Sequence, residues 1–136
     1  MIAGFTGTRW GLTEAQKTIL HDYLYNTPPT ELHHGDGGQG DAQAVAIAQS
    51  LAIPTYAHPG LMAKWRAHTT GNAVTYIPKP ELQRDRDIAV ICDVLFACPQ
   101  GMTELVKGSG TWATIRYAKA EKKRVVIIYP NGTHNG

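Results

Sequence analysis

The stretch Lys107–Pro130, KGSGTWATIRYAKAEKKRVVIIYP, decides the fold of this 136-residue chain. It reads as a glycine-rich turn, then a helix from Thr111 to about Lys122, then a β-branched strand over 124–129. A glycine turn that opens a helix gathers free backbone amides and partial positive charge, and such turns often hold a phosphate. The same turn can also be a tight connection only, and the stretch by itself does not distinguish these two roles.

The order of strand, turn and helix recurs along the whole chain. Short apolar runs without strict alternation are typical of strands that are covered on both faces of a parallel sheet. The sequence therefore predicts an α/β fold, a Rossmann-like three-layer fold with a mostly parallel sheet and helices on both faces. We expect strands at 1–5, 31–34, 53–57, 73–77, 94–98 and 124–129. We assign residues 1–130 to a single domain and 131–136 to a polar C-terminal tail.

Several local signals predict where the helices begin and end. Thr13 and Gln16 fit a capping box, and Asn26–Pro29 ends the helix that it opens. We expect Asp41 to be the N-cap of the second helix, and Pro80 to begin a third helix that ends near residue 92. Residues 60–72 predict a loop with one helical turn.

Composition and charge argue against a nucleic-acid-binding, a secreted or a membrane protein. A formal net charge of +2 gives no strong attraction to nucleic acid. Cys92 and Cys98 do not form a CxxC pair and stand in apolar surroundings, as is typical of buried, reduced thiols inside cells. The N-terminal MIAGFTGTRWG resembles neither a signal peptide nor a membrane span, so we expect a cytoplasmic protein without a membrane partner.

Three turns rich in glycine and hydroxyl groups should gather at the carboxyl ends of the strands, where ligands bind in such folds. They are Thr6–Arg9, Gly35–Asp41 and 108–111. Their hydroxyls and amides, together with the planar guanidinium of Arg9, suit an anionic ligand. Neither the dinucleotide fingerprint nor the P-loop pattern is present. Arg84 shares a helical face with Ile88, so it could reach the strand ends, or it could pair with neighbouring carboxylates on a solvated face.

Candidate catalytic groups are few. Asp36 and Asp41 could accept ribose hydroxyls or act as a general base, although an Asx turn and an N-cap explain them as well. Glu104 lies in a loop near the same edge. No histidine or cysteine spacing predicts a metal site, and we expect no cofactor. Tryptophans are ambiguous between core packing and ligand stacking, with Trp112 the one placed at a helix start.

Several segments together resemble the SLOG superfamily, which joins the DNA-processing protein A domain, the Lonely Guy cytokinin-activating enzymes and small stand-alone Rossmann-like proteins. The segments are GFTGTRWG, HHGDGGQGDAQAVAIA, RDRDIAV, DVLFACP and GSGTWATIRYA. The resemblance is to the small stand-alone members, and it implies a pocket for a nucleotide or nucleotide-derived ligand. The ligand-binding residues that it implies are Gly7, Thr8, Arg9, Gly35, Gly40, Asp41, Arg84, Ser109, Gly110 and Thr111.

The chain departs from this family pattern at one catalytic position. In the Lonely Guy enzymes a glutamate follows the G-x-G-T segment and takes part in cleaving a base from a ribose phosphate, whereas Thr114 stands at that position here. The candidates to replace it are Glu104 and Asp41. Our leading hypothesis is a binding protein or sensor for a phosphorylated, nucleotide-like small molecule, with Asp85 making the Arg84 corner more acidic than the family pattern.

Two other hypotheses stay open, and so does the question of whether the chain is an enzyme. One is an N-glycosidase of the phosphoribohydrolase kind that acts on nucleoside monophosphates. The other, disfavoured by the small net charge, is a single-stranded DNA-binding domain. Proteins this small in this fold often dimerise through helices, so a homo-oligomer is also open.

Overall fold

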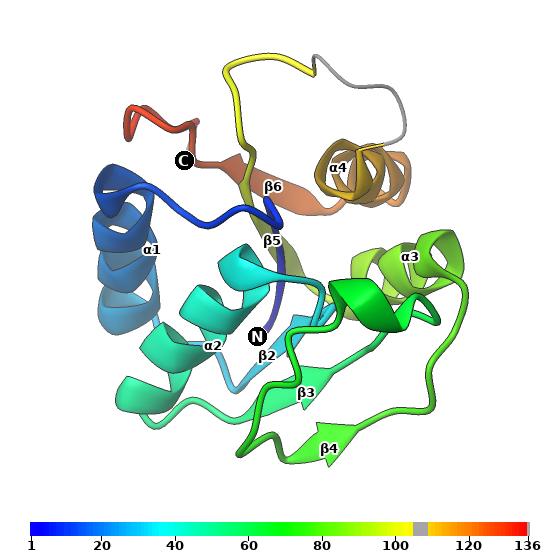
Figure 1. The fold of residues 1–136 in the computed structure, drawn as a ribbon. Coiled ribbons are helices and arrows are strands. Elements are labelled where there is room, and N and C mark those ends of the chain that lie inside the picture. The colour runs from blue at the N-terminus through cyan, green and yellow to red at the C-terminus, as the bar shows by residue number, and fades with distance from the viewer. Residues whose placement is uncertain (105–108, 136) are drawn as a thin grey trace.

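The computed structural model describes residues 1–104 and 109–135, and within them the chain alternates between strands and helices (Figure 1). The elements are β1 (Ile2–Gly7), α1 (Glu14–Asn26), β2 (Glu31–His34), α2 (Gln39–Ser50), β3 (Thr55–Ala57), the 3-10 turn η1 (Ala63–Trp65), β4 (Val74–Thr75), α3 (Glu81–Ile91), β5 (Val94–Cys98), α4 (Gly110–Ala120) and β6 (Arg124–Ile127).

The strands form one six-stranded sheet in the order β4-β3-β2-β1-β5-β6, and every pair is parallel. Helices α1 and α2 cover one face and α3 and α4 cover the other (Figure 1). The predicted Rossmann-like three-layer fold is confirmed. Because the chain runs outward from β1 to β4 and then crosses back to β5, the strand order reverses between β1 and β5, which is where such folds place their ligands.

The interior strand β5 supplies side chains to two separate cores. Val94, Phe96 and Cys98 pack on the α1–α2 side with Phe5, whereas Leu95 and Ala97 pack on the α3–α4 side. Successive side chains of a strand point to opposite faces, so a strand that is covered on both faces must be apolar throughout. This explains why the predicted strands read as continuous apolar runs.

Most of the local predictions hold, with one correction. Thr13 and Gln16 form the predicted capping box, and the Gln16 amide also donates to the carbonyl oxygens of Pro99 (2.8 Å) and Ile128 (3.0 Å). Asp41 was the wrong N-cap for α2, because the helix begins earlier, after Gly38. The chain turns there with a φ of 125°, which favours glycine.

Residues 131–135 turn back along β6. His134 makes an antiparallel bridge to Ile128, and the Asn135 side chain accepts from the Ile127 amide at 2.7 Å. Among the described residues, no helix has both the length and the apolar character needed to cross a membrane.

Candidate functional site

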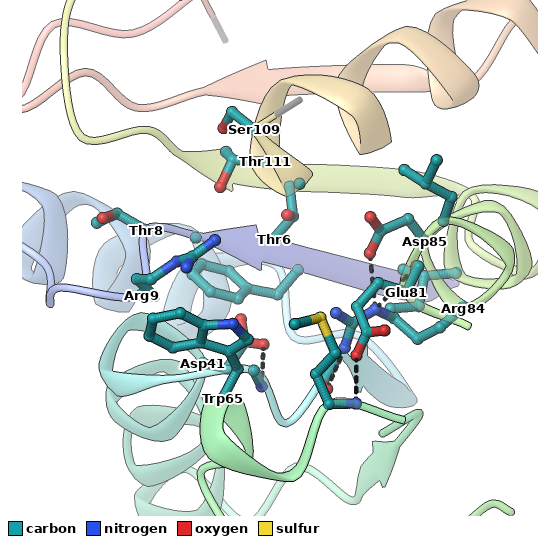
Figure 2. A pocket seen from close by; sticks show the side chains of 18 of the residues that line it. Thr6, Thr8, Arg9, Asp41, Trp65, Glu81, Arg84, Asp85, Ser109 and Thr111 are labelled. Atoms are coloured by element: carbon teal, nitrogen blue, oxygen red, sulfur yellow. Dashed lines mark hydrogen bonds and ion pairs between the residues drawn. The ribbon is translucent and has the colours of Figure 1, made fainter. Parts of the chain in front are cut away.

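A cleft of about 650 Å³ opens at the carboxyl ends of β1 and β5. Its walls come from the loop after β1, the loop after β2, the segment around η1, the start of α3 and the start of α4 (Figure 2). The lining residues are Phe5, Thr6, Gly7, Thr8, Arg9, Trp10, Gly35, Gly37, Asp41, Met62, Trp65, Glu81, Leu82, Arg84, Asp85, Ile88, Gln100, Ser109, Gly110 and Thr111. The switch point of the sheet therefore carries a real cavity.

The start of α4 faces this cleft. Ser109, Gly110 and Thr111 line it, and among the described residues no side chain caps the helix. The first amides of an α-helix have no acceptor within the helix and carry partial positive charge. With the hydroxyls of Ser109 and Thr111 beside them (Figure 2), they form a group of donors suited to an anion.

The start of α2 differs, because the loop after β1 already occupies it. The Gln39 amide donates to the Arg9 carbonyl at 3.0 Å, and the Gly40 amide donates to the Thr8 carbonyl at 3.1 Å. A Cβ added to Gly40 would overlap the Thr8 backbone. The starts of the two helices thus differ: the start of α2 is locked against the loop after β1, whereas the start of α4 faces the cleft.

One wall of the cleft is aromatic and basic. The Arg9 guanidinium lies over the Trp65 ring, 4.0 Å from its centroid, and Trp10 meets Trp65 edge to face at 6.3 Å. Figure 2 shows Arg9 and Trp65 side by side at the edge of the cavity. Such a pair offers a planar surface for a ring and a fixed cation for an acidic group.

Arg84 is buried at the floor of the cleft and most of its donors are engaged. Its guanidinium donates to the carbonyl oxygens of Gly35, His58 and Glu81, and its Nε lies 2.7 Å from Asp85 Oδ1. The side chain is 12% exposed. Neither sequence alternative was complete, because Arg84 reaches the strand ends and is also paired with a neighbouring carboxylate.

Two buried carboxyl groups, Asp41 and Asp85, lie on either side of Arg84. Burial raises the pKa of Asp85 to about 6, against the opposing effect of Arg84. Burial also raises the pKa of Asp41, opposed by His34 and Arg84. Each carboxyl group has one oxygen that is buried without a hydrogen-bond partner among the described residues, Oδ1 of Asp41 and Oδ2 of Asp85.

Asp85 faces the start of α4, near the position at which the Lonely Guy pattern has its glutamate. Its Oδ2 lies 3.5 Å from the place that a Cβ on Gly110 would occupy. Thr114 is fully buried there and its hydroxyl donates to the Gly110 carbonyl at 2.8 Å. The carboxyl group in this corner therefore comes from α3, and the helix that follows the glycine turn provides none.

All of the predicted ligand-binding residues except Gly40 line the cleft, and Gly108 lies outside the described residues. Glu104, a catalytic candidate, is not among the lining residues and pairs with Arg116 at 2.6 Å. Asp36 also stands apart from the lining, since its carboxylate holds the 60–72 loop through Arg66 and through the amide and hydroxyl of Thr69.

Sequence reasoning did not assign Trp65 or Glu81 to the site, and it gave Asp85 too little weight. The sequence feature that could have identified Asp85 is its position next to Arg84, because two consecutive residues at the start of a helix can both reach the same part of the cleft. Trp65 gave no usable signal, since residues 60–72 form an irregular loop whose path depends on Asp36. Trp112 packs against the α3–α4 core and is not among the residues that line the cleft.

The strand-end histidines form a network of their own beside the cleft. His33 lies between Glu31 and His58, at 2.8 Å from each, and His34 bonds to Asn72 at 2.8 Å. Burial lowers the pKa of His58 to about 4, and neighbouring His33 adds to this effect. Within the described part of the chain, no group of three or more acidic, histidine or cysteine side chains could hold a metal ion.

Comparison with known proteins places this geometry in a structural context. No protein-family model matches the chain, and no curated protein sequence matches it. Among solved structures, a molybdenum cofactor binding protein from the phototrophic bacterium Rippkaea orientalis superposes with a TM-score of 0.72 and 17% identity, covering 94% of this chain and 76% of that one. The molybdenum cofactor carrier protein of Chlamydomonas reinhardtii gives 0.66 and 22%, covering 93% and 75%.

A structural genomics target, TM1055, is also similar, with a TM-score of 0.64 and 13% identity over 91% of this chain and 71% of that one. Identities this low establish a common fold and leave the ligand open. The chain therefore shares the Rossmann-like fold of these three proteins.

Proposed function

We propose that this chain binds a nucleotide or a nucleotide-derived phosphorylated ligand in the cleft, as a sensor or binding protein of the SLOG type. The observation that carries the proposal is the uncapped start of α4 at the switch point of the sheet, where Ser109, Gly110 and Thr111 line the cavity. A phosphate there would accept hydrogen bonds from the helix amides and the two hydroxyls.

The rest of the cleft fits the other parts of such a ligand. Arg9 adds a cation near the open end, and its planar guanidinium suits phosphate. The Trp65 ring packs under the Arg9 guanidinium, has Lys64 Nζ 5.0 Å from its centroid, and adds an aromatic surface for a base. The volume of about 650 Å³ is within the range of small-molecule sites.

The molybdenum cofactor is a second candidate ligand. The reason is the similarity in fold to a binding protein and a carrier protein for that cofactor over nine-tenths of this chain. It would occupy the same cleft and belongs in the same binding experiment.

An N-glycosidase that acts on nucleoside monophosphates is the alternative from a different class. The buried carboxyl groups of Asp41 and Asp85 favour it, since such a reaction needs a carboxyl group at the sugar. Glu104 no longer supports it, because its pairing with Arg116 lies outside the cleft lining.

A ligand panel tests the proposal. The purified protein is titrated with nucleoside monophosphates, the matching unphosphorylated nucleosides, ADP-ribose and the molybdenum cofactor, and followed by thermal shift. Chromatography of each mixture detects released base. Stabilisation by phosphorylated members without released base supports a binding protein, and released base supports the glycosidase. Equal responses to nucleosides and their monophosphates would contradict a phosphate site at α4.

A matched pair of arginine variants checks the position of the ligand. Arg9 lies over Trp65 in the cleft, and Arg86 lies over Tyr117, 4.9 Å from the ring centroid, outside it. Arg9→Gln should weaken binding of the phosphorylated ligand by about tenfold, the effect of one charge-assisted hydrogen bond. Arg86→Gln makes the same chemical change and should leave the affinity unchanged.

A further inference from the structure

We infer that Asp41 and Asp85 form a subsite for hydrogen-bond donors, so that the ligand carries hydroxyl or amino groups next to its phosphate. This inference rests on the proposed function and identifies which part of the ligand the floor of the cleft recognises. It concerns two residues that are 6% and 5% exposed and line the cavity from opposite sides of the sheet.

Each carboxyl group uses one oxygen within the protein and leaves the other available. Asp41 Oδ2 accepts from the Gly37 amide at 2.8 Å, and Asp85 Oδ1 lies 2.7 Å from Arg84 Nε. The remaining oxygens, Asp41 Oδ1 and Asp85 Oδ2, are buried and have no hydrogen-bond partner among the described residues. The Thr114 hydroxyl also lies near Asp85, but it donates to the Gly110 carbonyl at 2.8 Å. Among the described residues, no other buried side-chain nitrogen or oxygen atom lacks a hydrogen-bond partner.

Buried polar atoms without partners are rare in native proteins because their desolvation is not compensated. Two such atoms in one cleft, both acceptors, define what is missing: a group that donates hydrogen bonds. Arg84 uses Nε and Nη1 for backbone carbonyls and for Asp85 Oδ1, and no hydrogen bond among the described residues joins it to either free oxygen.

The charges at the floor of the cleft disfavour a phosphate in this subsite. One guanidinium stands between two carboxyl groups, so an added phosphate would meet acceptors and negative charge. Neutral donors such as sugar hydroxyls or ring amino groups meet no such repulsion. Figure 2 shows Asp41 and Asp85 on different sides of the cleft, both below Ser109 and Thr111 in this view. The donors would thus lie at the floor of the cleft, next to the phosphate.

Asparagine variants test this subsite without removing its internal bonds. In Asp41→Asn and Asp85→Asn, the amide oxygen can keep the existing contact, and the amide nitrogen replaces the free acceptor with a donor. Asp87→Asn is the matched control. Asp87 lies on α3, as Asp85 does, accepts hydrogen bonds from Lys79 and Gln83, and does not line the cleft. Each protein is titrated calorimetrically with guanosine 5′-monophosphate, its 2′-deoxy analogue and inosine 5′-monophosphate.

We expect each of the two cleft variants to bind guanosine 5′-monophosphate about 10- to 100-fold more weakly, the effect of losing one hydrogen bond to a charged group. The control should stay within about twofold. A weaker response of the wild type to the 2′-deoxy analogue assigns the donor to the sugar, and a weaker response to inosine 5′-monophosphate assigns it to the ring amino group.

Three results would overturn the inference in distinguishable ways. If both cleft variants bind like the wild type, the subsite is wrong while the proposed function stands. If magnesium chloride alone stabilises the wild type but not the variants, the two carboxyl groups hold a cation instead. If the wild type binds none of the three nucleotides, this inference and the nucleotide proposal fail together. The melting temperature of each variant without ligand shows that a loss of binding is not a loss of folding.

Discussion

Asp85→Asn should make the ligand-free protein more stable at neutral pH. Burial raises the pKa of Asp85 from its ordinary value of 3.8 to about 6, so the folded state disfavours the charged carboxylate. Each pKa unit corresponds to 1.36 kcal/mol, and a shift of about 2 units therefore amounts to roughly 3 kcal/mol. Asparagine is never charged, but its buried amide also loses water, so we expect a gain of about 1–3 kcal/mol.

The sign of the effect fixes its pH dependence. A group whose pKa is raised on folding contributes full stability below its unfolded pKa, and that stability is lost as the pH rises through the folded pKa. The wild type should therefore lose stability relative to Asp85→Asn between pH 4 and pH 7. At pH 4 the two proteins should differ least.

Thermal and urea denaturation from pH 4 to pH 7 measure this difference. A gain of about 1–3 kcal/mol corresponds to a melting temperature higher by roughly 3–10 °C at pH 7. Asp87→Asn serves as the control: although slight burial opposes it, hydrogen bonds from Lys79 and Gln83 lower the pKa of Asp87, so this variant should be slightly less stable at pH 7. A variant Asp85→Asn that is less stable than the wild type at pH 7, or a difference that does not change with pH, would refute the reasoning.

Three other substitutions have direct expectations. Gly40→Ala forces a Cβ into the Thr8 backbone and should cost about 1–3 kcal/mol in urea denaturation; a neutral result would mean that the two loops separate easily. Trp65→Ala should weaken ligand binding about tenfold in calorimetry with little change in melting temperature, because the ring is only partly buried. Glu104→Gln should leave ligand binding and any turnover unchanged and alter stability by less than about 1 kcal/mol, since its pair with Arg116 is exposed.

The fold could be predicted from the sequence because its signals are local. The capping box at Thr13, the proline stops and the apolar runs each depend on a few neighbouring residues, and all of them agree on alternating strands and helices. The N-cap of α2 was the exception. Asp41 has the side chain of an N-cap, but Gly38 has the backbone freedom that the turn requires, and backbone conformation prevailed.

The site could be predicted only in part. Parallel strands bring their carboxyl ends to one edge, so Thr8, Arg9 and the start of α4 were predictable from topology. The environment of each side chain was not. Asp85 becomes important because α3 packs against the start of α4, and Trp65 enters the cleft because a distant carboxylate, Asp36, holds its loop. Such contacts join residues far apart in the chain and leave no periodic pattern in the sequence.

Arg84 ties together segments from different parts of the fold at one side of the cleft. From α3 it holds the carbonyl oxygens of Gly35 and His58, which follow strands β2 and β3. It therefore connects a helix on one face of the sheet to the loop that leads to α2 on the other face, and also to the loop that follows β3. A ligand that spans α4 and Trp65 would add a second connection of this kind. The bound molecule would then act as a clamp between the two helical layers, and hydrogen exchange should slow in both cores and not only around the cleft.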